Sequence, residues 1–437
     1  MAQHGPYTTE TEVERAILVG CPTKDISHRA TEEHLEELGR LADTAGAVVV
    51  GTLVQRLDAP HPRHYIGEGK VAELKSQIES TGATLVIFDD ELSPAQSKNL
   101  EEELGTRIVD RTELILDIFA TRARTSEAQM QVELAQLEYM LPRLRRMWTH
   151  LERIRGGIGF RGPGETQLET DRRLIKIRIR DLREKLKLVA QRRATQRKGR
   201  HGEFRVALVG YTNAGKSSIL RALSGTDIFV ENRLFATLDP ATRVVELGPG
   251  ARVLVTDTVG FIRKLPHHLV ASFRATLEEV TEADLILHVI DASHPGWEEH
   301  MEVVDDVLSD LGAGEKPTVL VFNKVDRLTH EEEAAFREHA RSSFSRDVVF
   351  ASAIEEGGLD ELRARIHAEL RSQRPEVEIT IPAADGESLA TIYREGEVLR
   401  REDGEMTIAL TARIPRPTLG RLVRKPGIAV LEPAAES

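Results

Sequence analysis

Eight consecutive residues near the middle of the chain have the types and spacing needed to bind phosphate. Gly210-Tyr-Thr-Asn-Ala-Gly-Lys-Ser217 follows the apolar run Phe204–Val209 and precedes a helical pattern. In a strand–loop–helix setting, such glycines let backbone N–H groups point at phosphate oxygens, and the helix N-terminus adds its positive end. The alternative is a tight glycine turn with an exposed lysine. The expected contacts are Gly210, Tyr211, Thr212, Asn213, Ala214, Gly215, Lys216 and Ser217.

A second motif, Asn323-Lys-Val-Asp326, ends the apolar run Thr318–Phe322 and indicates which base is bound. A carboxylate here accepts hydrogen bonds from guanine N1–H and the 2-amino group, whereas adenine would leave it unpaired at considerable cost. We expect Asn323 and Lys324 to tie this loop to the phosphate loop and to stack on the ring. The expected base contacts are Asn323, Lys324, Val325 and Asp326, with backbone N–H groups of Ser352, Ala353 and Ile354 reaching the guanine carbonyl.

Two segments between these motifs are expected to contact the γ-phosphate and Mg²⁺. Lys216 should reach the β- and γ-phosphates, while the hydroxyls of Ser217 and Thr237 are the candidate metal ligands. Asp257 can hold Mg²⁺ through water, and the Gly260 N–H can sense the γ-phosphate. The expected nucleotide contacts in these segments are Phe235, Ala236, Thr237, Leu238, Asp239, Asp257, Thr258, Val259 and Gly260.

The order of these elements resembles the small-GTPase family from residue 203 to 374. The resemblance implies GTP/GDP and Mg²⁺ as ligands, a mostly parallel sheet wrapped by helices, and switch segments that loss of the γ-phosphate releases. One position departs from the pattern, because Phe261 stands where a glutamine orients the attacking water. In related GTPases with an apolar residue there, an asparagine matching Asn213 binds a K⁺ that stabilises the transition state. Asn213 is therefore either catalytic, with Lys216 and Thr237, or only a cap of its loop.

The chain around this site predicts three further parts. Strand-like runs at Ala16–Val19, Ala47–Leu53, Thr84–Phe88 and Arg107–Val109 alternate with helical stretches, which indicates a small parallel α/β unit. After residue 375, strand-like runs at Val377–Ile381 and Met406–Ala412 favour a small α+β domain. A helical turn at Thr418–Lys425 is weakened by Gly420.

Two apolar seams with heptad steps precede the phosphate loop. The first comprises Met130, Leu134, Leu137, Leu141, Leu144, Trp148 and Leu151; the second comprises Ile175, Ile179, Leu182, Leu186 and Val189. The segment Arg155–Gln167 between them has five glycines and Pro163, so we expect an antiparallel helical hairpin with a glycine-rich tip. From Arg143 to Arg200 there are 19 Lys and Arg but 6 Asp and Glu, a net +13 in a chain of net charge −12. A basic rod fits RNA phosphates, although a solvated helix face is the simpler interpretation.

The string from Arg155 to Arg173, together with Phe235-Ala-Thr-Leu-Asp239 and the phosphate loop, closely resembles the HflX family of bacterial GTPases. The resemblance covers nearly the full chain and is least distinctive in the C-terminal region. It implies GTP hydrolysis, binding to the 50S ribosomal subunit and its rRNA, and rescue or splitting of stalled 70S ribosomes under stress. GTP would favour the bound form and hydrolysis would release it. The alternative is a signalling or scaffold GTPase whose hairpin binds a protein partner.

The fold class expected is α/β: a P-loop G domain with an N-terminal α/β unit, a long antiparallel helical hairpin and a small C-terminal α+β domain. The expected boundaries are 14–111, 112–200, 203–374 and 375–437. Family members have been linked to ATP through the N-terminal unit, but Tyr65-Ile-Gly-Glu-Gly-Lys70 lacks a full P-loop and favours a plain helix start. With one cysteine, Cys21, and no apolar run of membrane length, we expect a cytoplasmic monomer without a membrane span. Transient membrane association is left open.

Overall fold

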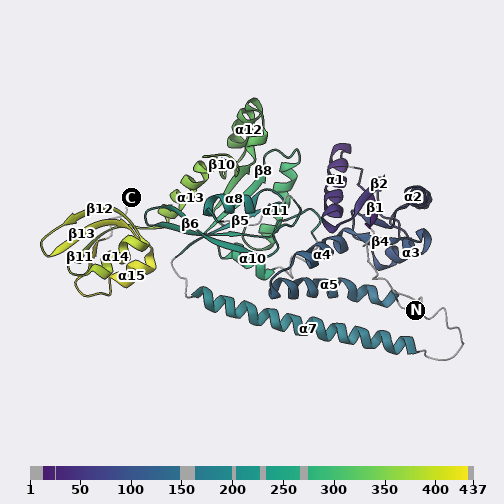
Figure 1. The fold of residues 1–437 in the computed structure, drawn as a ribbon, viewed down its shortest axis with the longest axis horizontal. Helices are drawn as coiled ribbons and strands as arrows, with labels where there is room; N and C mark the ends of the chain where they lie inside the picture. Colours follow the sequence, from purple (N-terminus) through teal and green to yellow (C-terminus); the bar gives the residue numbers. More distant parts are fainter. Residues whose placement is uncertain are drawn as a thin grey trace, which may run out of the picture. The chain divides into compact units, whose positions relative to one another are not determined.

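A computed structural model describes residues 13–24, 26–147, 163–198, 203–226, 233–265 and 274–431 (Figure 1). The chain divides into two compact units, residues 1–186 with 264–272 and residues 187–263 with 273–437. Three sheets lie along the chain, two in α/β arrangements and one antiparallel. The predicted fold class is therefore confirmed.

The first unit begins with a four-stranded parallel sheet in the order β2-β1-β3-β4. Its apolar core includes Ile17, Val86 and Phe88 from the strands and Leu74 and Leu100 from the helices. Gly67 caps the N-terminus of the second helix, so the Tyr65–Lys70 segment is a helix start. The elements are β1 (Arg15–Gly20), α1 (His28–Ala45), β2 (Val48–Val54), α2 (Glu68–Thr81), β3 (Leu85–Phe88), α3 (Pro94–Leu104), β4 (Arg107–Asp110) and α4 (Arg111–Arg122).

Two long helices, α5 (Ser126–Met147) and α7 (Pro163–Lys198), form the predicted antiparallel hairpin (Figure 1). The two seams meet in one apolar cluster: Met130, Leu134, Leu137, Leu141, Ile175, Ile179, Leu182 and Leu186. The glycine-rich break was expected to extend to Gln167, but helix α7 already starts at Pro163. Proline is favoured at the first helical position because its φ is helical and it has no N–H group that needs a partner. Trp148, Leu151 and the tip as far as residue 162 lie outside the described residues.

The second unit contains a six-stranded sheet in the order β10-β9-β8-β5-β7-β6, parallel except for β6. Helices α8 and α13 pack against one apolar layer, and α11 and α12 pack against a second. The elements are β5 (Phe204–Gly210), α8 (Lys216–Ser224), β6 (Ala241–Gly248), β7 (Ala251–Asp257), α10 (Arg274–Thr281), β8 (Leu285–Asp291), α11 (Trp297–Asp310), β9 (Thr318–Asn323), η1 (Val325–Arg327), α12 (His330–Ser343), β10 (Asp347–Ala351) and α13 (Asp360–Ser372).

The last part of the chain is an antiparallel sheet in the order β12-β13-β11-β14, with α14 and α15 packed on one face. Gly420 lies inside α15, so the weakened helical turn does form. The elements are β11 (Glu376–Pro382), α14 (Gly386–Glu395), β12 (Glu397–Asp403), β13 (Thr407–Arg413), α15 (Arg416–Leu422) and β14 (Ala429–Leu431).

The hairpin formed by β6 and β7 reaches this antiparallel sheet. Its turn residue Gly250 has φ +69°, and a Cβ there would lie 1.9 Å from the carbonyl oxygen of Gly396. The Arg374 guanidinium donates a hydrogen bond to the Gly250 carbonyl at 2.9 Å, and Arg371 pairs with Glu397 at the start of β12. Glycine at position 250 is therefore required by both backbone conformation and space.

Candidate functional site

The predicted phosphate loop lies between the end of β5 and the start of α8. Gly210 and Gly215 have φ values of +154° and +100°, conformations that favour glycine. A Cβ on Gly210 would lie 2.2 Å from the Val289 carbonyl oxygen, and one on Gly215 would lie 2.2 Å from the Asn323 side-chain nitrogen. The two glycines therefore let the loop pack tightly against β8 and the base loop.

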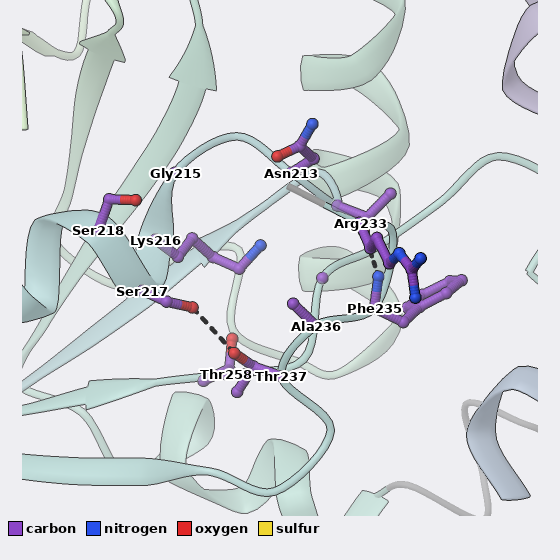
Figure 2. A pocket seen from close by; sticks show the side chains of 12 residues that line it. Asn213, Gly215, Lys216, Ser217, Ser218, Arg233, Phe235, Ala236, Thr237 and Thr258 are labelled. Carbon is purple, nitrogen blue, oxygen red and sulfur yellow. Dashed lines mark hydrogen bonds between the residues drawn. The ribbon is translucent and has the colours of Figure 1, made fainter. Parts of the chain in front are cut away.

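A pocket opens over this loop, and Figure 2 shows Lys216 pointing along it. Lys216 is buried, and its Nζ donates to the carbonyl oxygens of Gly210 at 3.0 Å and Tyr211 at 2.9 Å. Burial lowers the pKa of Lys216 to about 8, and the nearby Asp257 carboxylate opposes this shift. The pocket is lined by Thr212, Asn213, Gly215, Lys216, Ser217, Ser218, Arg233, Phe235, Ala236, Thr237, Thr258 and Gly260.

The depressed pKa of Lys216 predicts that nucleotide affinity falls above pH 8. Phosphate oxygens favour the ammonium form, so binding must take up a proton once the free lysine has lost its own. We expect the Kd for GDP to rise about twofold between pH 7 and 8 and to be about tenfold higher at pH 9 than at pH 7. Calorimetric titrations in two buffers of different ionisation enthalpy would measure the proton uptake.

The matched control is Lys216→Arg, because a guanidinium stays protonated over this range. This variant should bind GDP more weakly than the native protein does, but its Kd should not depend on pH between 7 and 9. A Kd of the native protein that is equally level, with no proton uptake at pH 9, would contradict the expected role of the Lys216 ammonium.

Three oxygen-bearing side chains meet beside Lys216. The Ser217 hydroxyl lies 2.8 Å from the Thr237 hydroxyl (Figure 2). It also donates a hydrogen bond to Asp257 Oδ2 at 2.6 Å. Asp257 is buried, and its Oδ1 has no hydrogen-bond partner among the described residues. Burial raises the pKa of Asp257, while Lys216 and the two hydroxyls oppose that rise. A buried carboxylate oxygen beside two hydroxyls is an all-oxygen donor set of the kind that Mg²⁺ prefers, so these residues fit the ion.

The segment after Asp257 is hydrogen-bonded to the phosphate loop. Phe261 N donates to the Gly210 carbonyl at 3.1 Å, and Thr212 N donates to the Phe261 carbonyl at 2.7 Å. The Phe261 side chain is fully buried, so it packs as an apolar residue. Gly260 lies so close that a Cβ would be 2.6 Å from Thr212 Cα and 3.1 Å from Lys216 Nζ.

The predicted base loop is joined to the phosphate loop by two side chains. Asn323 Nδ2 donates to the Ala214 carbonyl at 2.9 Å, and Lys324 Nζ donates to the Asn213 carbonyl at 2.8 Å. These two hydrogen bonds join the base loop to the phosphate loop, while the expected stacking on the guanine ring stays a prediction.

The Asp326 carboxylate is held by the loop that follows β10. Its Oδ1 accepts a hydrogen bond from the Ser352 hydroxyl at 2.7 Å. Carboxylate, hydroxyl and the backbone of the next residues therefore come together at one edge of the sheet. Ile354 is 75% exposed, so any role in base binding falls to its backbone.

The remaining predicted residues divide by burial. Ala214, Leu238, Val259 and Val325 are buried and pack into the protein, while Ala353 and Asp239 are half-buried. Phe235 is buried and has φ +54°, and its N–H donates to the Thr212 hydroxyl at 2.9 Å.

Three residues near the site were missed by the sequence reasoning. Arg233 lines the pocket (Figure 2), Asp291 binds Lys324 at 2.6 Å, and Ser218 also lines the pocket. For Arg233, the weak signal was a basic residue two positions before Phe235. For Asp291, the signal was a carboxylate at the end of a strand that the pattern places beside the base loop.

Models of known protein families match most of the chain. A model described as "GTP-binding GTPase N-terminal" matches residues 32–120, one described as "GTP-binding GTPase Middle Region" matches 122–200, and one described as "50S ribosome-binding GTPase" matches 205–324. Together these matches cover the first sheet, the helical hairpin and the nucleotide site up to Lys324.

Proteins named GTPase HflX are similar over almost their full length. The one from Caldanaerobacter subterraneus is 49% identical, covering 92% of this chain and 91% of its own. The one from Magnetococcus marinus is 44% identical, covering 97% and 98%, and the one from Escherichia coli is 41% identical, covering 90% and 92%.

Among solved structures, a GTP-binding protein from Sulfolobus solfataricus in complex with GDP is 24% identical, with a TM-score of 0.44, covering 82% of this chain and 99% of that one. The identities to the bacterial relatives and their coverage are sufficient to establish the family. The chain belongs to the HflX family of GTPases, as its motifs predict, and it is a GTP hydrolase.

Proposed function

We propose that this GTPase binds the 50S ribosomal subunit and its rRNA, and that it rescues or splits stalled 70S ribosomes under stress. The GTP-bound form is the active one, and hydrolysis releases it. The observation that carries the proposal is the basic helical hairpin, in which the described seam residues pack inward and most of the described lysines and arginines of α7 are exposed. The description of the family model over residues 205–324, a 50S ribosome-binding GTPase, supports the same partner.

The acidic residues of α5 neutralise only part of the charge on α7. Arg178 pairs with Glu133 through two hydrogen bonds of 2.6 and 2.7 Å, and Arg183 pairs with Glu138 at 2.7 Å. Arg173, Lys176 and Lys187 are exposed along the same helix. A row of exposed cations on a rigid rod supports binding to the phosphates of an RNA duplex or loop.

Reversing the exposed charges of α7 should abolish nucleotide-dependent binding to 50S subunits. In the variant R173E/K176E/K187E, three phosphate contacts become three repulsions, so we expect binding to fall by about 10²-fold or more at moderate salt. Co-sedimentation with purified 50S subunits, with a non-hydrolysable GTP analogue or with GDP, measures the loss.

The control R63E/K75E/R424E changes the net charge equally at exposed positions outside the hairpin. It should still pellet with 50S subunits when the GTP analogue is present. Pelleting of the hairpin variant that equals native, or that ignores the nucleotide in both variants, would favour the alternative of a signalling or scaffold GTPase.

The site residues are proposed to act as follows. Lys216 binds the β- and γ-phosphates, Ser217 and Thr237 hold Mg²⁺ with Asp257 behind them, and Asp326 recognises guanine. Bound Mg²⁺ supplies positive charge against that of the phosphates. Asn213 is proposed to bind K⁺; its φ of +61° and the Lys324 contact to its carbonyl equally support a role in shaping the loop.

We also propose the four-part division 14–111, 112–200, 203–374 and 375–437, and a cytoplasmic monomer. The elements fall within these parts except for Arg111, which begins α4. Across the ranges that the structure describes, no helix is long and apolar enough to cross a membrane.

A further inference from the structure

Asp291 lies at the carboxyl end of β8, beside the loop that carries the proposed guanine contacts. In the sheet register it pairs with Asn323, the last residue of β9. The Asp291 side chain is only 15% exposed. Because carboxyl ends of parallel strands line the ligand-binding edge of such a sheet, a sheltered carboxylate here is well placed to act on the site.

Both oxygens of this carboxylate are engaged. Oδ2 accepts a hydrogen bond from Lys324 Nζ at 2.6 Å. Oδ1 accepts from the Ser293 hydroxyl at 2.6 Å and from the Ser293 N–H at 3.1 Å. Ser293 thus fixes the direction in which Asp291 presents its charge to the lysine.

Lys324 needs such a partner. Its backbone has φ +65°, a conformation that costs energy for a residue other than glycine. Its Nζ spans two loops, since it also donates to the Asn213 carbonyl at 2.8 Å. The lysine side chain is 15% exposed, so its ammonium has lost much of its water and depends on the Asp291 charge.

We propose that Asp291, oriented by Ser293, is a positioning residue for guanine-nucleotide binding. It holds the Lys324 ammonium so that the lysine stem forms a fixed platform for the purine and keeps the base loop joined to the phosphate loop. The inference rests on the proposed base site at Asn323–Asp326. It adds that the affinity of that site is set by a carboxylate outside the motif, and that the effect is the same for GDP and GTP.

The test is Asp291→Asn, which keeps the shape of the side chain and removes its charge. A charge-assisted hydrogen bond at a partly buried site predicts that dissociation of a fluorescent GDP analogue becomes about 10- to 100-fold faster, with little change in association. KM for GTP should rise by a similar factor while kcat at saturation stays within about twofold, because the reacting phosphate is not touched. Ser293→Ala should shift the dissociation rate in the same direction by a smaller factor.

Asp305→Asn is the matched control. Asp305 lies on α11 of the same domain, pairs with Arg346 through two hydrogen bonds of 2.9 and 2.7 Å, and lies 3.4 Å from His288 in the middle of β8. Losing this carboxylate should lower the melting temperature and leave nucleotide dissociation unchanged. If Asp291→Asn does not fold, Asp291→Glu keeps the charge one methylene further out and should give an intermediate dissociation rate.

A double-mutant cycle separates positioning from a general loss of stability. In a Lys324→Met background, Asp291→Asn should add less than about twofold to the dissociation rate, because the group it positions is gone. An equal acceleration in both backgrounds, or an unchanged dissociation rate in the folded single variant, overturns the proposal. Failure of the base site itself is distinguished by Asp326→Asn, which changes the choice of purine, whereas Asp291→Asn weakens all guanine nucleotides alike.

Discussion

Lys216→Ala is expected to abolish GTP turnover, lowering kcat/KM by about 10²–10³-fold or more. In the structure its ammonium is buried at the floor of the pocket and satisfied by two loop carbonyls. The phosphates of a bound nucleotide would take over these hydrogen bonds with charged partners, and the charge would count most in the transition state. Phosphate release and nucleotide binding, measured separately, show how the loss divides between kcat and KM.

Lys316→Ala is the matched control for the removal of a lysine from this domain. Lys316 donates to the Ala283 carbonyl at 2.8 Å, near the start of β8 and outside the pocket. Its variant should retain turnover within about twofold, even if it melts at a lower temperature. Native-like GTP turnover by a folded Lys216→Ala variant would contradict the assignment of the phosphate loop.

Asp326→Asn is expected to change the base that the protein prefers from guanine to xanthine. The carboxylate accepts from two donors of guanine, and an amide presents a donor that suits the additional xanthine carbonyl. A site built around such hydrogen bonds discriminates strongly, so we expect GTP affinity to fall by about 10³-fold or more and xanthosine triphosphate to bind better than GTP. Competition against a fluorescent GDP analogue measures both affinities.

Two further variants, Ser352→Ala and Asp347→Asn, serve as comparisons for Asp326→Asn. Ser352 donates to Asp326 at 2.7 Å, so its loss should weaken GTP binding without changing the preferred purine. Asp347, paired with Arg365 at the opposite end of β10 from Ser352, should have no effect on nucleotide affinity. GTP affinity that survives Asp326→Asn unchanged would refute base recognition by this carboxylate.

Local sequence patterns predicted the elements of the first unit well. The run Ala16–Val19 falls within β1, Thr84–Phe88 nearly coincides with β3, and α3 (Pro94–Leu104) is one of the helical stretches expected between the runs. These elements have strong local signals, namely short buried apolar runs and a Ser–Pro helix start with a capping box at Ser93. The heptad seams also predicted the helical hairpin, because heptad spacing determines which residues of the two helices meet.

The C-terminal region was predicted only in part, since its missed elements lack such signals. β12 reads Glu-Val-Leu-Arg-Arg-Glu-Asp, and most of its side chains are exposed because it is an edge strand. Its place is determined by pairing with β13, which is a non-local interaction. Helix α14 is short, and β14 has three residues, so neither gives a clear periodic pattern.

The nucleotide motifs were recognisable because each is contiguous, whereas Asp291 was not. Asp291 and Lys324 are 33 residues apart and meet only because β8 and β9 are neighbours in the sheet. Arg233 precedes Phe235 in a segment without periodicity, and its place at the pocket depends on how this segment lies beside the phosphate loop, where Phe235 N–H donates to the Thr212 hydroxyl. The sequence patterns thus identified the motifs, and the fold was needed to find the side chains that support them.

The tight contact of Gly250 with Gly396 has a mechanical consequence. One strand of the hairpin starts just after Asp239, the other ends at Asp257, and the turn that joins them rests on the C-terminal sheet. Because the two strands are hydrogen-bonded to each other, a shift of their nucleotide end would move the whole hairpin, including the turn at Gly250. Such a shift would then either move the C-terminal sheet together with the turn or break the contact between Gly250 and Gly396.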